Sequence, residues 1–373
     1  MRMSRTDFLY LSEPDLIKTG VLDAAKCINV CEEVFRILHE GDYLMGGPNH
    51  NEHGLVLVFP KETKFEHMPV AGPERRFISM PAYLGGRFAV CGEKWYGSNV
   101  KNPKERGLPR SILNVTINDP DTCEPLAYMS GNLISSMRTG CIPGVGVRYL
   151  ANKDAETISV VGVGPIQKAT LLAMKSELKN LKRVVAKAAH LERAQAFVEW
   201  AKEELGLEGC AKESMEEAIR LGDVVSIAAS PKEPLYLKDE WLKEGATVLL
   251  TSPIEADDAF WLNNKLVFDN TKMHEAYYDE AVKLGDITKA CNGWGKMYAL
   301  MEQGRLAVLE QQISLGDVVT EPSYGRKTPQ EKQIFVTSGQ VLFDIAWGYE
   351  LYREALKKGI GTKLNLWQEP YWT

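Results

Sequence analysis

A glycine-rich turn between a strand and a helix is the feature that most constrains the fold. Residues 157–161 form a continuous apolar run, a Gly-Val-Gly turn follows at once, and a helix is expected over 165–178. Such a turn leaves the N–H groups of a helix N-terminus free to bind phosphate. Gln167 takes the place of the usual third glycine, so the dinucleotide-binding fingerprint is incomplete. The pattern still predicts a phosphate-binding loop made of Gly162, Val163, Gly164, Pro165 and Ile166.

Strands and helices alternate from residue 157 onward. Helices are expected between short buried strands, with strands at 183–186, 224–228, 247–250 and 266–268 and helices at 191–205, 214–220 and 238–244. This alternation is typical of a doubly wound parallel sheet with helices on both faces. We therefore predict a Rossmann dinucleotide-binding domain over residues 141–329.

The first part of the chain has a different pattern. After a helix at 22–40, strands follow one another without helices between them, at 76–83, 88–96, 111–119 and 124–130. Consecutive strands predict an antiparallel sheet. An amphipathic helix from Val341 to Leu356 is expected to return to this sheet. The predicted fold is thus α/β, with an additional α+β domain made of residues 1–140 and 330–373.

Composition excludes several classes of protein. Lys and Arg number 44 against 50 Asp and Glu, without a long basic block, which argues against nonspecific nucleic-acid binding. No apolar run approaches the roughly 20 residues of a membrane span, and the first residues lack a secretory signal. The cysteines form no Cys-x-x-Cys pair, so we expect a cytoplasmic protein without bound metal and with reduced thiols at positions 27, 31, 91, 123, 141, 210 and 291.

The end of the second strand of the Rossmann domain indicates which dinucleotide would bind. Folds that prefer NAD carry a carboxylate there, which accepts hydrogen bonds from the adenosine ribose. This chain has no acidic residue in that place and offers Lys187, His190 and Arg193 instead. A 2′-phosphate needs cationic partners, so NADP(H) is predicted over NAD(H). The alternative is that these three side chains are merely solvated at a helix start.

Several segments of the chain stand in a distinctive order. They are Arg76 to Tyr83 with its Met-Pro pair, Lys94-Trp95-x-Gly97-Ser98, Asn118-Asp119-Pro120, Ile134 to Thr139 and Gly361 to Leu366. In these segments and in their order, the chain resembles the ornithine cyclodeaminase and mu-crystallin family over nearly its whole length. It is most similar to the branch of amino-acid dehydrogenases that cleave an opine-like conjugate in 2,3-diaminopropionate biosynthesis. The resemblance implies a homodimer whose antiparallel-sheet domain binds a small amino-acid or imine substrate.

The resemblance also implies roles for individual residues. Lys94 would lie beside the substrate carboxylate or reacting nitrogen, Arg76 would clamp a carboxylate, and Met80 would line the pocket. Arg138 and Thr139 would contact the cofactor phosphates. The alternative for each of the charged residues is an ordinary surface charge, and for Met80 a place in the core. The predicted cofactor-binding set is completed by Ala229 and Ser252, which follow the strands at 224–228 and 247–250.

The chain also departs from the family pattern. Ile78 replaces a glutamate of the cyclodeaminases, and the stretch 49–53 replaces an arginine that usually follows an early proline. Where the family places a catalytic aspartate, Glu255 stands here, with Asp257 as the alternative. Asp344, near the start of the last helix, could either touch substrate or serve packing.

We predict hydride transfer between the α-carbon of an amino acid or opine-like conjugate and a nicotinamide, through an imine. A base must first remove a proton from the substrate nitrogen, and Glu255 or Asp257 is the predicted base. One alternative is a cyclodeaminase without net redox change, which Ile78 disfavours. The other is an NADPH-binding protein of the mu-crystallin type.

Overall fold

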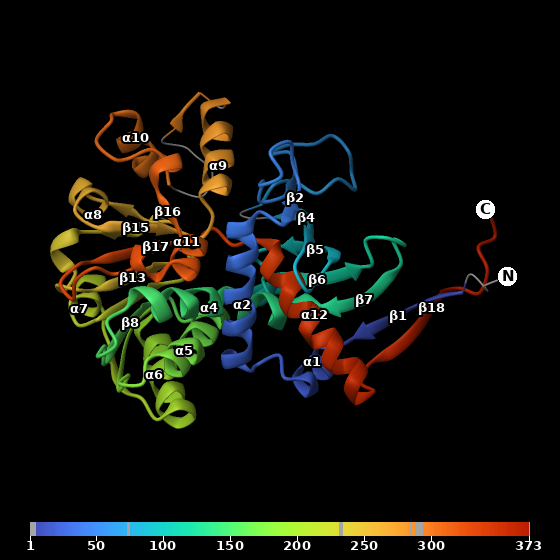
Figure 1. The fold of residues 1–373 in the computed structure, drawn as a ribbon, viewed down its shortest axis with the longest axis horizontal. Helices are drawn as coiled ribbons and strands as arrows, with labels where there is room; N and C mark the ends of the chain where they lie inside the picture. The colour runs from blue at the N-terminus through green and yellow to red at the C-terminus, as the bar shows by residue number, and fades with distance from the viewer. Residues whose placement is uncertain (1–4, 73–74, 231–233, 284, 288–293, 373) are drawn as a thin grey trace. The chain divides into compact units, whose positions relative to one another are not determined.

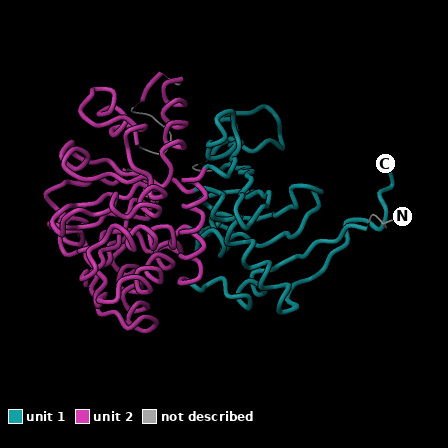
Figure 2. The backbone as a smooth tube through the Cα atoms, viewed as in Figure 1, with its two compact units in different colours: residues 1–23, 41–138, 340–373 teal, residues 24–40, 139–339 magenta. Residues whose placement is uncertain are grey.

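The computed structural model describes residues 5–72, 75–230, 234–283, 285–287 and 294–372 (Figure 1). The chain forms two compact units, shown in different colours in Figure 2. Unit 1 comprises residues 1–23, 41–138 and 340–373, and unit 2 comprises residues 24–40 and 139–339. Residues 24–40, 139–140 and 330–339, which the sequence-based division assigned to the first domain, belong to unit 2.

Unit 2 is built on a parallel sheet of eight strands. Its order is β10 (Glu208–Ala211), β9 (Arg183–Lys187), β8 (Thr157–Val161), β11 (Val224–Ile227), β13 (Thr247–Leu250), β17 (Gln333–Val336), β15 (Lys265–Phe268) and β16 (Ile313–Ser314). The central strands are buried along their whole length because both faces of the sheet are covered. The strand order reverses between β8 and β11, and ligands of such sheets bind at the carboxyl ends of the strands at this point.

Unit 2 contains several helices. They are α2 (Ala24–Glu40), the second part of α4 (Gly131–Leu150), α5 (Pro165–Glu177), α6 (Leu191–Leu205), α7 (Met215–Ile219), α8 (Asp258–Leu262), α9 (Thr271–Lys283), α10 (Gly295–Glu302) and α11 (Leu315–Thr320). The helix expected at 238–244 is wrong: only a 3-10 turn, Asp239–Trp241, forms, because the backbone is extended again at Leu242. A short pair of strands, β12 (Tyr236–Leu237) and β14 (Glu255–Ala256), lies outside the main sheet.

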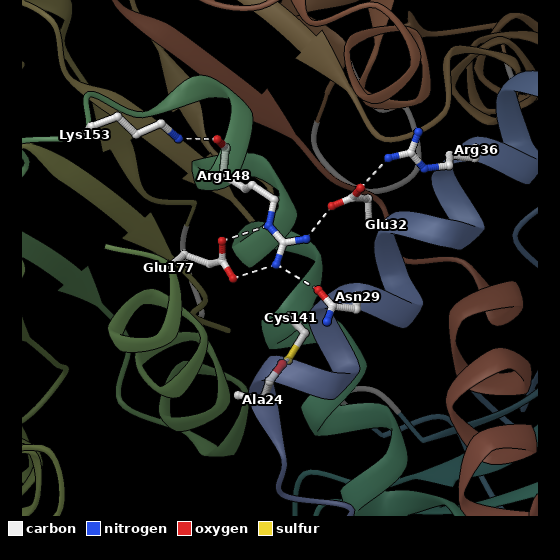
Figure 3. A network of polar contacts seen from close by, with 8 residues as sticks. All are labelled: Ala24, Asn29, Glu32, Arg36, Cys141, Arg148, Lys153 and Glu177. Carbon is white, nitrogen blue, oxygen red and sulfur yellow. Dashed lines mark hydrogen bonds and ion pairs between the residues drawn. The ribbon is translucent and has the colours of Figure 1, made fainter. Parts of the chain in front are cut away.

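Arg148 joins three helices of unit 2, as Figure 3 shows. From α4 its Nε and Nη2 donate to the two carboxylate oxygens of Glu177 on α5, both at 2.8 Å. Nη2 also donates to Oδ1 of Asn29 at 3.0 Å, and Nη1 donates to Glu32, both on α2. Two carboxylates around one guanidinium raise the pKa of Arg148. The network joins α2 to α4 and α5, and α2 also packs on α11, so α2 belongs to this unit.

Unit 1 is built on a second, mostly antiparallel sheet. Its order is β18 (Thr362–Trp367), β1 (Thr6–Leu11), β7 (Pro125–Ser130), β6 (Ser111–Asn118), β5 (Val90–Ser98), β4 (Arg76–Leu84) and β2 (Tyr43–Met45), and β3 (Leu55–Val58) also pairs with β4. Only β1 and β7 are parallel among these pairs. Short helices α1 (Glu13–Thr19) and α3 (Asn102–Glu105) complete the connections, and α12 (Val341–Lys358) packs on β4, β5 and β6.

The two faces of this sheet differ in character. The face under α12 is buried and includes Ile78, Met80 and Val115. Helix α12 approaches so closely that a Cβ on Gly92 would lie 2.9 Å from Cγ1 of Ile345. The opposite face leaves apolar side chains exposed, Trp95 and Tyr128 among them. This alternation of buried and exposed residues is the pattern of a sheet that packs on one side only.

Membrane and thiol predictions can be compared with the described residues. In the described part of the chain, no helix combines the length and the apolar character needed to cross a bilayer. Cys27 and Cys31 are buried, and the cysteines of the described ranges are free thiols. Cys291 lies outside the described residues.

Candidate active-site groups

The phosphate loop of unit 2 leaves the N-terminus of α5 open. Gly162 adopts φ +92°, and a Cβ there would lie 2.2 Å from the carbonyl oxygen of Ala228, so only glycine fits. Gly164, the N-cap residue of α5, would meet nothing within 4 Å if it carried a Cβ. It is exposed, and no side chain caps the helix. The free N–H groups of the first helical turn therefore suit the pyrophosphate of a dinucleotide.

Gln167 shows how the incomplete fingerprint is accommodated. Gln167 belongs to α5, and its side chain is fully buried. Its Oε1 accepts a hydrogen bond from Oγ of Ser226 on β11 at 3.3 Å. Its Nε2 has no hydrogen-bond partner among the described residues. The position that usually holds a glycine for close helix–strand packing is thus filled by an amide that bonds to the neighbouring strand.

Apart from Arg138, the other residues predicted to bind a cofactor lie in unit 2. Nζ of Lys187, at the end of β9, donates to the carbonyl oxygen of Ala188 at 2.7 Å. His190 is the N-cap residue of α6, its side chain makes no capping bond, and both His190 and Arg193 are exposed. The loops after β11 and β13 are joined by a hydrogen bond of 3.2 Å from the N–H of Ala229 to Oγ of Ser252. Thr139 is half-buried on α4.

The two carboxylates predicted as the base are not desolvated. Glu255 is exposed in β14. Asp257 is the N-cap residue of α8, where its Oδ1 accepts hydrogen bonds from the N–H groups of Phe260 at 2.8 Å and Asp239 at 3.3 Å. Glu255 is thus solvated, and the carboxylate of Asp257 is engaged at the start of a helix. Nothing in the geometry of unit 2 favours either residue as a base.

A buried ion-pair cluster occupies the α12-facing side of the sheet in unit 1. Oδ2 of Asp344, on α12, lies 2.8 Å from Nζ of Lys94 on β5 and 3.0 Å from Nε of Arg138. The side chains of Lys94, Arg138 and Asp344 are only 4%, 5% and 0% exposed. Oδ1 of Asp344 has no hydrogen-bond partner among the described residues. Burying two cations beside one carboxylate is costly for stability, which is a feature of functional sites.

Burial and charge perturb the pKa values within this cluster. Burial, reinforced by the positive charge of Arg138, lowers the pKa of Lys94 to about 8, although Asp344 opposes this shift. Burial raises the pKa of Asp344, but the two cations outweigh it and hold that pKa below its usual value. Lys94 therefore populates both its ammonium and its amine near neutral pH, as a general acid or base must.

Arg76, Met80 and Tyr96 lie on the same sheet face as Lys94. Met80 is directly opposite Lys94 in the register of β4 and β5, and it is 1% exposed. Burial raises the pKa of Tyr96, and the positive charge of the nearby Arg76 opposes this shift. Nε of Arg76 is buried and has no hydrogen-bond partner among the described residues. The structure thus brings together the three residues predicted to bind substrate, Arg76, Met80 and Lys94.

His53 is a member of this site that the sequence analysis did not assign. Desolvation, and then the charges of Lys94, Arg138 and Arg76, lower its pKa to about 3. The following residue, Gly54, lies against β4, because a Cβ there would be 2.7 Å from the carbonyl oxygen of Ser79. The signal was present in the sequence, since the stretch 49–53 replaces an arginine of the family.

Arg138 is the residue of this cluster that the resemblance implied would contact the cofactor phosphates. It pairs with Asp344 in unit 1, beside the predicted substrate residues. Its contact with cofactor phosphates stays a prediction. The sequence left open whether Asp344 contacts substrate or serves packing. Its carboxylate pairs with Lys94 and Arg138, so it belongs to this buried cluster. Among the described ranges, no group of three or more His, Cys, Asp or Glu side chains could hold a metal ion.

Comparison with known proteins establishes the family. The sequence pattern of the ornithine cyclodeaminase/mu-crystallin family matches residues 21–359. The chain belongs to this family, as its motifs predicted. It is similar to the N-((2S)-2-amino-2-carboxyethyl)-L-glutamate dehydrogenase of Staphylococcus aureus, with 30% identity over 347 residues, 88% of this chain and 98% of that protein. The predicted class, an oxidoreductase of this family, is confirmed.

Solved structures confirm the predicted fold class. The Δ1-pyrroline-2-carboxylate reductase of Thermococcus litoralis, solved with NADH and L-proline, superimposes with a TM-score of 0.77 and 24% identity over 95% of this chain and 99% of that one. An archaeal alanine dehydrogenase dimer with bound NAD gives a TM-score of 0.75 and 24% identity over 97% of this chain and the whole of that one. Both comparisons show that the folds are similar.

Proposed function

We propose that this protein transfers a hydride between the α-carbon of an amino acid, or of an opine-type conjugate, and a nicotinamide dinucleotide, through an imine. The observation that carries the proposal is the buried cluster of Lys94, Arg138 and Asp344, in which one lysine has a pKa of about 8. Unit 2 supplies the groups that bind the nucleotide, and unit 1 supplies those that bind the substrate.

The nucleotide is held by unit 2. The open first turn of α5 binds the pyrophosphate, and Gly164 leaves room for its close approach. Lys187 ends β9, His190 and Arg193 stand at the start of α6, and no carboxylate follows β9 directly to repel an adenosine 2′-phosphate. These charges support NADP(H) over NAD(H). Titration with both reduced nucleotides tests this preference, and tighter binding of NADH would refute it.

Lys94 acts on the proton of the substrate nitrogen. A bound oxidised nicotinamide would supply the acceptor for the hydride, which carries both electrons of the α C–H bond. The amine form of Lys94 first takes a proton from the substrate ammonium, so that the nitrogen lone pair can form the C=N bond. Water then adds to the imine carbon, the C–N bond breaks, and a 2-oxo acid and an amine leave. In the reverse direction the Lys94 ammonium returns the proton as the imine is reduced.

Arg138 orients the substrate carboxylate in this scheme. Its guanidinium offers fixed donors suited to a carboxylate, and Asp344 holds it in place through Nε. Asp344 also keeps the cluster from carrying two uncompensated buried cations. Met80 packs opposite Lys94 and helps to exclude water.

A cyclodeaminase is less well supported by the site. Ile78, 2% exposed, presents an apolar side chain where cyclodeaminases carry a glutamate. Turnover by a cyclodeaminase consumes and regenerates the same nucleotide, so reduced nicotinamide would not accumulate. An NADPH-binding protein of the mu-crystallin type would bind the nucleotide without turnover.

We also propose that the protein acts in the cytoplasm as a homodimer. The exposed face of the sheet in unit 1 carries the large apolar side chains of Tyr10, Trp95, Ile112 and Tyr128, and exposed apolar side chains gathered on one face are typical of an interaction surface. The similar archaeal alanine dehydrogenase was solved as a dimer. Free thiols fit a reducing compartment. Sedimentation of the wild type and of Trp95→Glu tests the dimer, because a charge on this face should separate the subunits.

A substrate screen tests the enzymatic proposal. Amino acids and opines are offered with NADP⁺ or NAD⁺, and mixtures of 2-oxo acids and amines are offered with the reduced nucleotides. The expected result is a change in the absorbance of reduced nicotinamide with at least one compound. If the protein binds the nucleotide but no compound changes this absorbance, the result would favour an NADPH-binding protein of the mu-crystallin type over an enzyme.

A further inference from the structure

The segment that follows β18 exposes two large aromatic side chains. Residues 368–372, here called the arm, include Tyr371 and Trp372, which are 89% and 86% exposed. These are the highest values among the large apolar residues of the described ranges. Aromatic side chains are stabilised by leaving water, and they are the residues that most often anchor an interface. The arm therefore has the composition of a segment that another surface covers.

An apolar cavity of about 430 Å³ lies on the face of the sheet in unit 1 that is opposite α12, where Trp95 is exposed. Phe77 and Trp95 line it and are stacked, with ring centroids 5.6 Å apart. Phe59 also lines it and meets Phe77 edge to face. The side-chain amide of Asn114 adds a group that can accept a hydrogen bond from an indole N–H. The cavity thus suits an aromatic side chain with a polar edge.

The arm and the wall of the cavity carry opposite charges. Arg75 lines the cavity, and one of its nitrogens donates to the carbonyl oxygen of Val70 at 3.3 Å. Among the described residues Arg75 forms no ion pair with a carboxylate. Glu369, two residues before Tyr371, is exposed and pairs with no cation in the described part of the chain. A carboxylate beside the two rings therefore matches a guanidinium beside the cavity.

The arm leaves the sheet at the end that lies farther from the cavity. Through the strand pairs, Trp95 is level with Ser130, one residue beyond the partner of Leu11 on β7. Trp367, the last residue of β18, pairs with Thr6 at the other end of β1. Six residues at about 3.3 Å each separate these two levels by roughly 20 Å along the strands. Figure 1 shows β1 and β18 running on together beyond β7.

The arm is too short to reach the cavity of its own chain. β18 and β5 are four strands apart in the sheet, which is about 19 Å at the usual strand spacing. This displacement across the sheet adds to the roughly 20 Å along the strands. Five residues span at most about 18 Å when fully extended. The chain that fills the cavity with an arm is therefore a different molecule.

We propose that each arm inserts Tyr371 and Trp372 into the cavity of a second copy of this chain, with Glu369 beside the partner's Arg75. This inference rests on the proposed homodimer and names the contact that holds it together. Two sheets that face each other with antiparallel strands bring the arm end of one over the cavity end of the other. In such a two-fold pair each chain gives one arm and receives one. The cavity is continuous with the exposed apolar face, because Trp95 belongs to both.

Sedimentation over a range of concentrations tests the arm. Replacing both rings, Tyr371→Ala with Trp372→Ala, should raise the dimer dissociation constant roughly 30-fold, as the loss of an interface anchor does. Tyr324→Ala, which removes an exposed tyrosine from unit 2, is the matched control and should leave association unchanged. Arg75→Glu and Glu369→Arg should each weaken the dimer about 2- to 5-fold, and the two together should restore it.

Mixing two altered chains tests whether the contact joins two molecules. A variant lacking residues 368–373 keeps its cavity, whereas Asn114→Trp keeps its arm and fills the cavity. Neither variant alone can form the contact, but a mixed pair can form it once. The mixed pair should therefore associate about 5-fold more tightly than either variant alone, since one of two contacts worth 30-fold together is regained. Circular dichroism and thermal melting show that both variants are folded.

The outcomes separate this inference from the homodimer itself. If the wild type dimerises and the loss of both rings leaves its dissociation constant unchanged, the arm contact is rejected and the homodimer stands. A wild type that stays monomeric at every concentration rejects both. If both altered chains associate weakly and mixing brings no gain, the arm does not occupy the cavity of a second copy, and the inference is overturned. The enzymatic proposal depends on none of these results.

Discussion

The two candidate sites are built in opposite ways. In unit 2, the phosphate loop is one short contiguous segment whose useful groups are backbone N–H donors, and it works because side chains are absent at Gly162 and Gly164. In unit 1, the cluster draws charged side chains from separate elements and buries them. A backbone site should therefore respond to added bulk, whereas a side-chain site should respond to changes in charge.

The largest expected effect is the loss of Lys94. Lys94→Met keeps the length and removes the acid–base group, so kcat should fall by about 10²- to 10⁴-fold, the usual contribution of general acid–base catalysis. Affinity for the nucleotide should stay the same, since the residue lies in unit 1. Initial rates and nucleotide titrations measure the two quantities. Lys101→Met, on an exposed lysine paired with Glu105, is the control. Full activity of Lys94→Met would reject the assigned role.

Asp344→Asn changes charge without changing shape. It leaves Lys94 and Arg138 buried without a counter-charge, which costs about 3–5 kcal/mol for a broken buried pair. Thermal melting should show a clear decrease in stability.

The same variant predicts a direction for the pH profile. Asp344 raises the pKa of Lys94, so its removal should lower that pKa below about 8. A base with a lower pKa is deprotonated at lower pH, so the acidic limb of the rate profile should move to lower pH. If Asp344→Asn is folded but the acidic limb of its rate profile stays at the wild-type pH, Lys94 is not the group whose titration produces that limb.

The difference in construction also explains what the sequence could predict. The loop was predictable in detail because its residues are adjacent and each glycine has a local reason. In unit 1, Lys94, Arg76 and Met80 were identified through motifs, but the pairing of Lys94 with Asp344 spans 250 residues and depends on how α12 packs on the sheet. The departure from the family pattern at 49–53 marked the neighbourhood of His53, but its place near Lys94, Arg138 and Arg76 depends on how β5, α4 and β4 pack. Glu255 and Asp257 matched a family position, yet the local fold leaves one exposed and uses the other as a helix cap.

Two glycines of the loop should respond differently to added bulk. Gly164→Val places a side chain in open space at an ordinary φ of −81°, so the fold should be kept while nucleotide affinity falls by roughly 100-fold, because the phosphates can no longer approach. Gly162→Ala forces a Cβ onto the carbonyl of Ala228 at φ +92° and should destabilise unit 2 itself. Calorimetric titration and thermal melting distinguish the outcomes. Equal losses of stability in both variants would contradict this division of roles.

The smallest expected effect compares an arginine from each unit. Arg148 is 27% exposed and fully paired with Glu32, Glu177 and Asn29, so Arg148→Met should lower stability by about 1–2 kcal/mol, a value reduced by solvent screening. Arg76 carries an unpaired buried Nε and an uncompensated charge, so Arg76→Met should leave stability unchanged or increase it slightly. Urea unfolding of both variants without ligand measures this contrast. A loss at Arg76 as large as that at Arg148 would mean that Arg76 is a structural residue, because a side chain reserved for substrate contributes nothing until the substrate arrives.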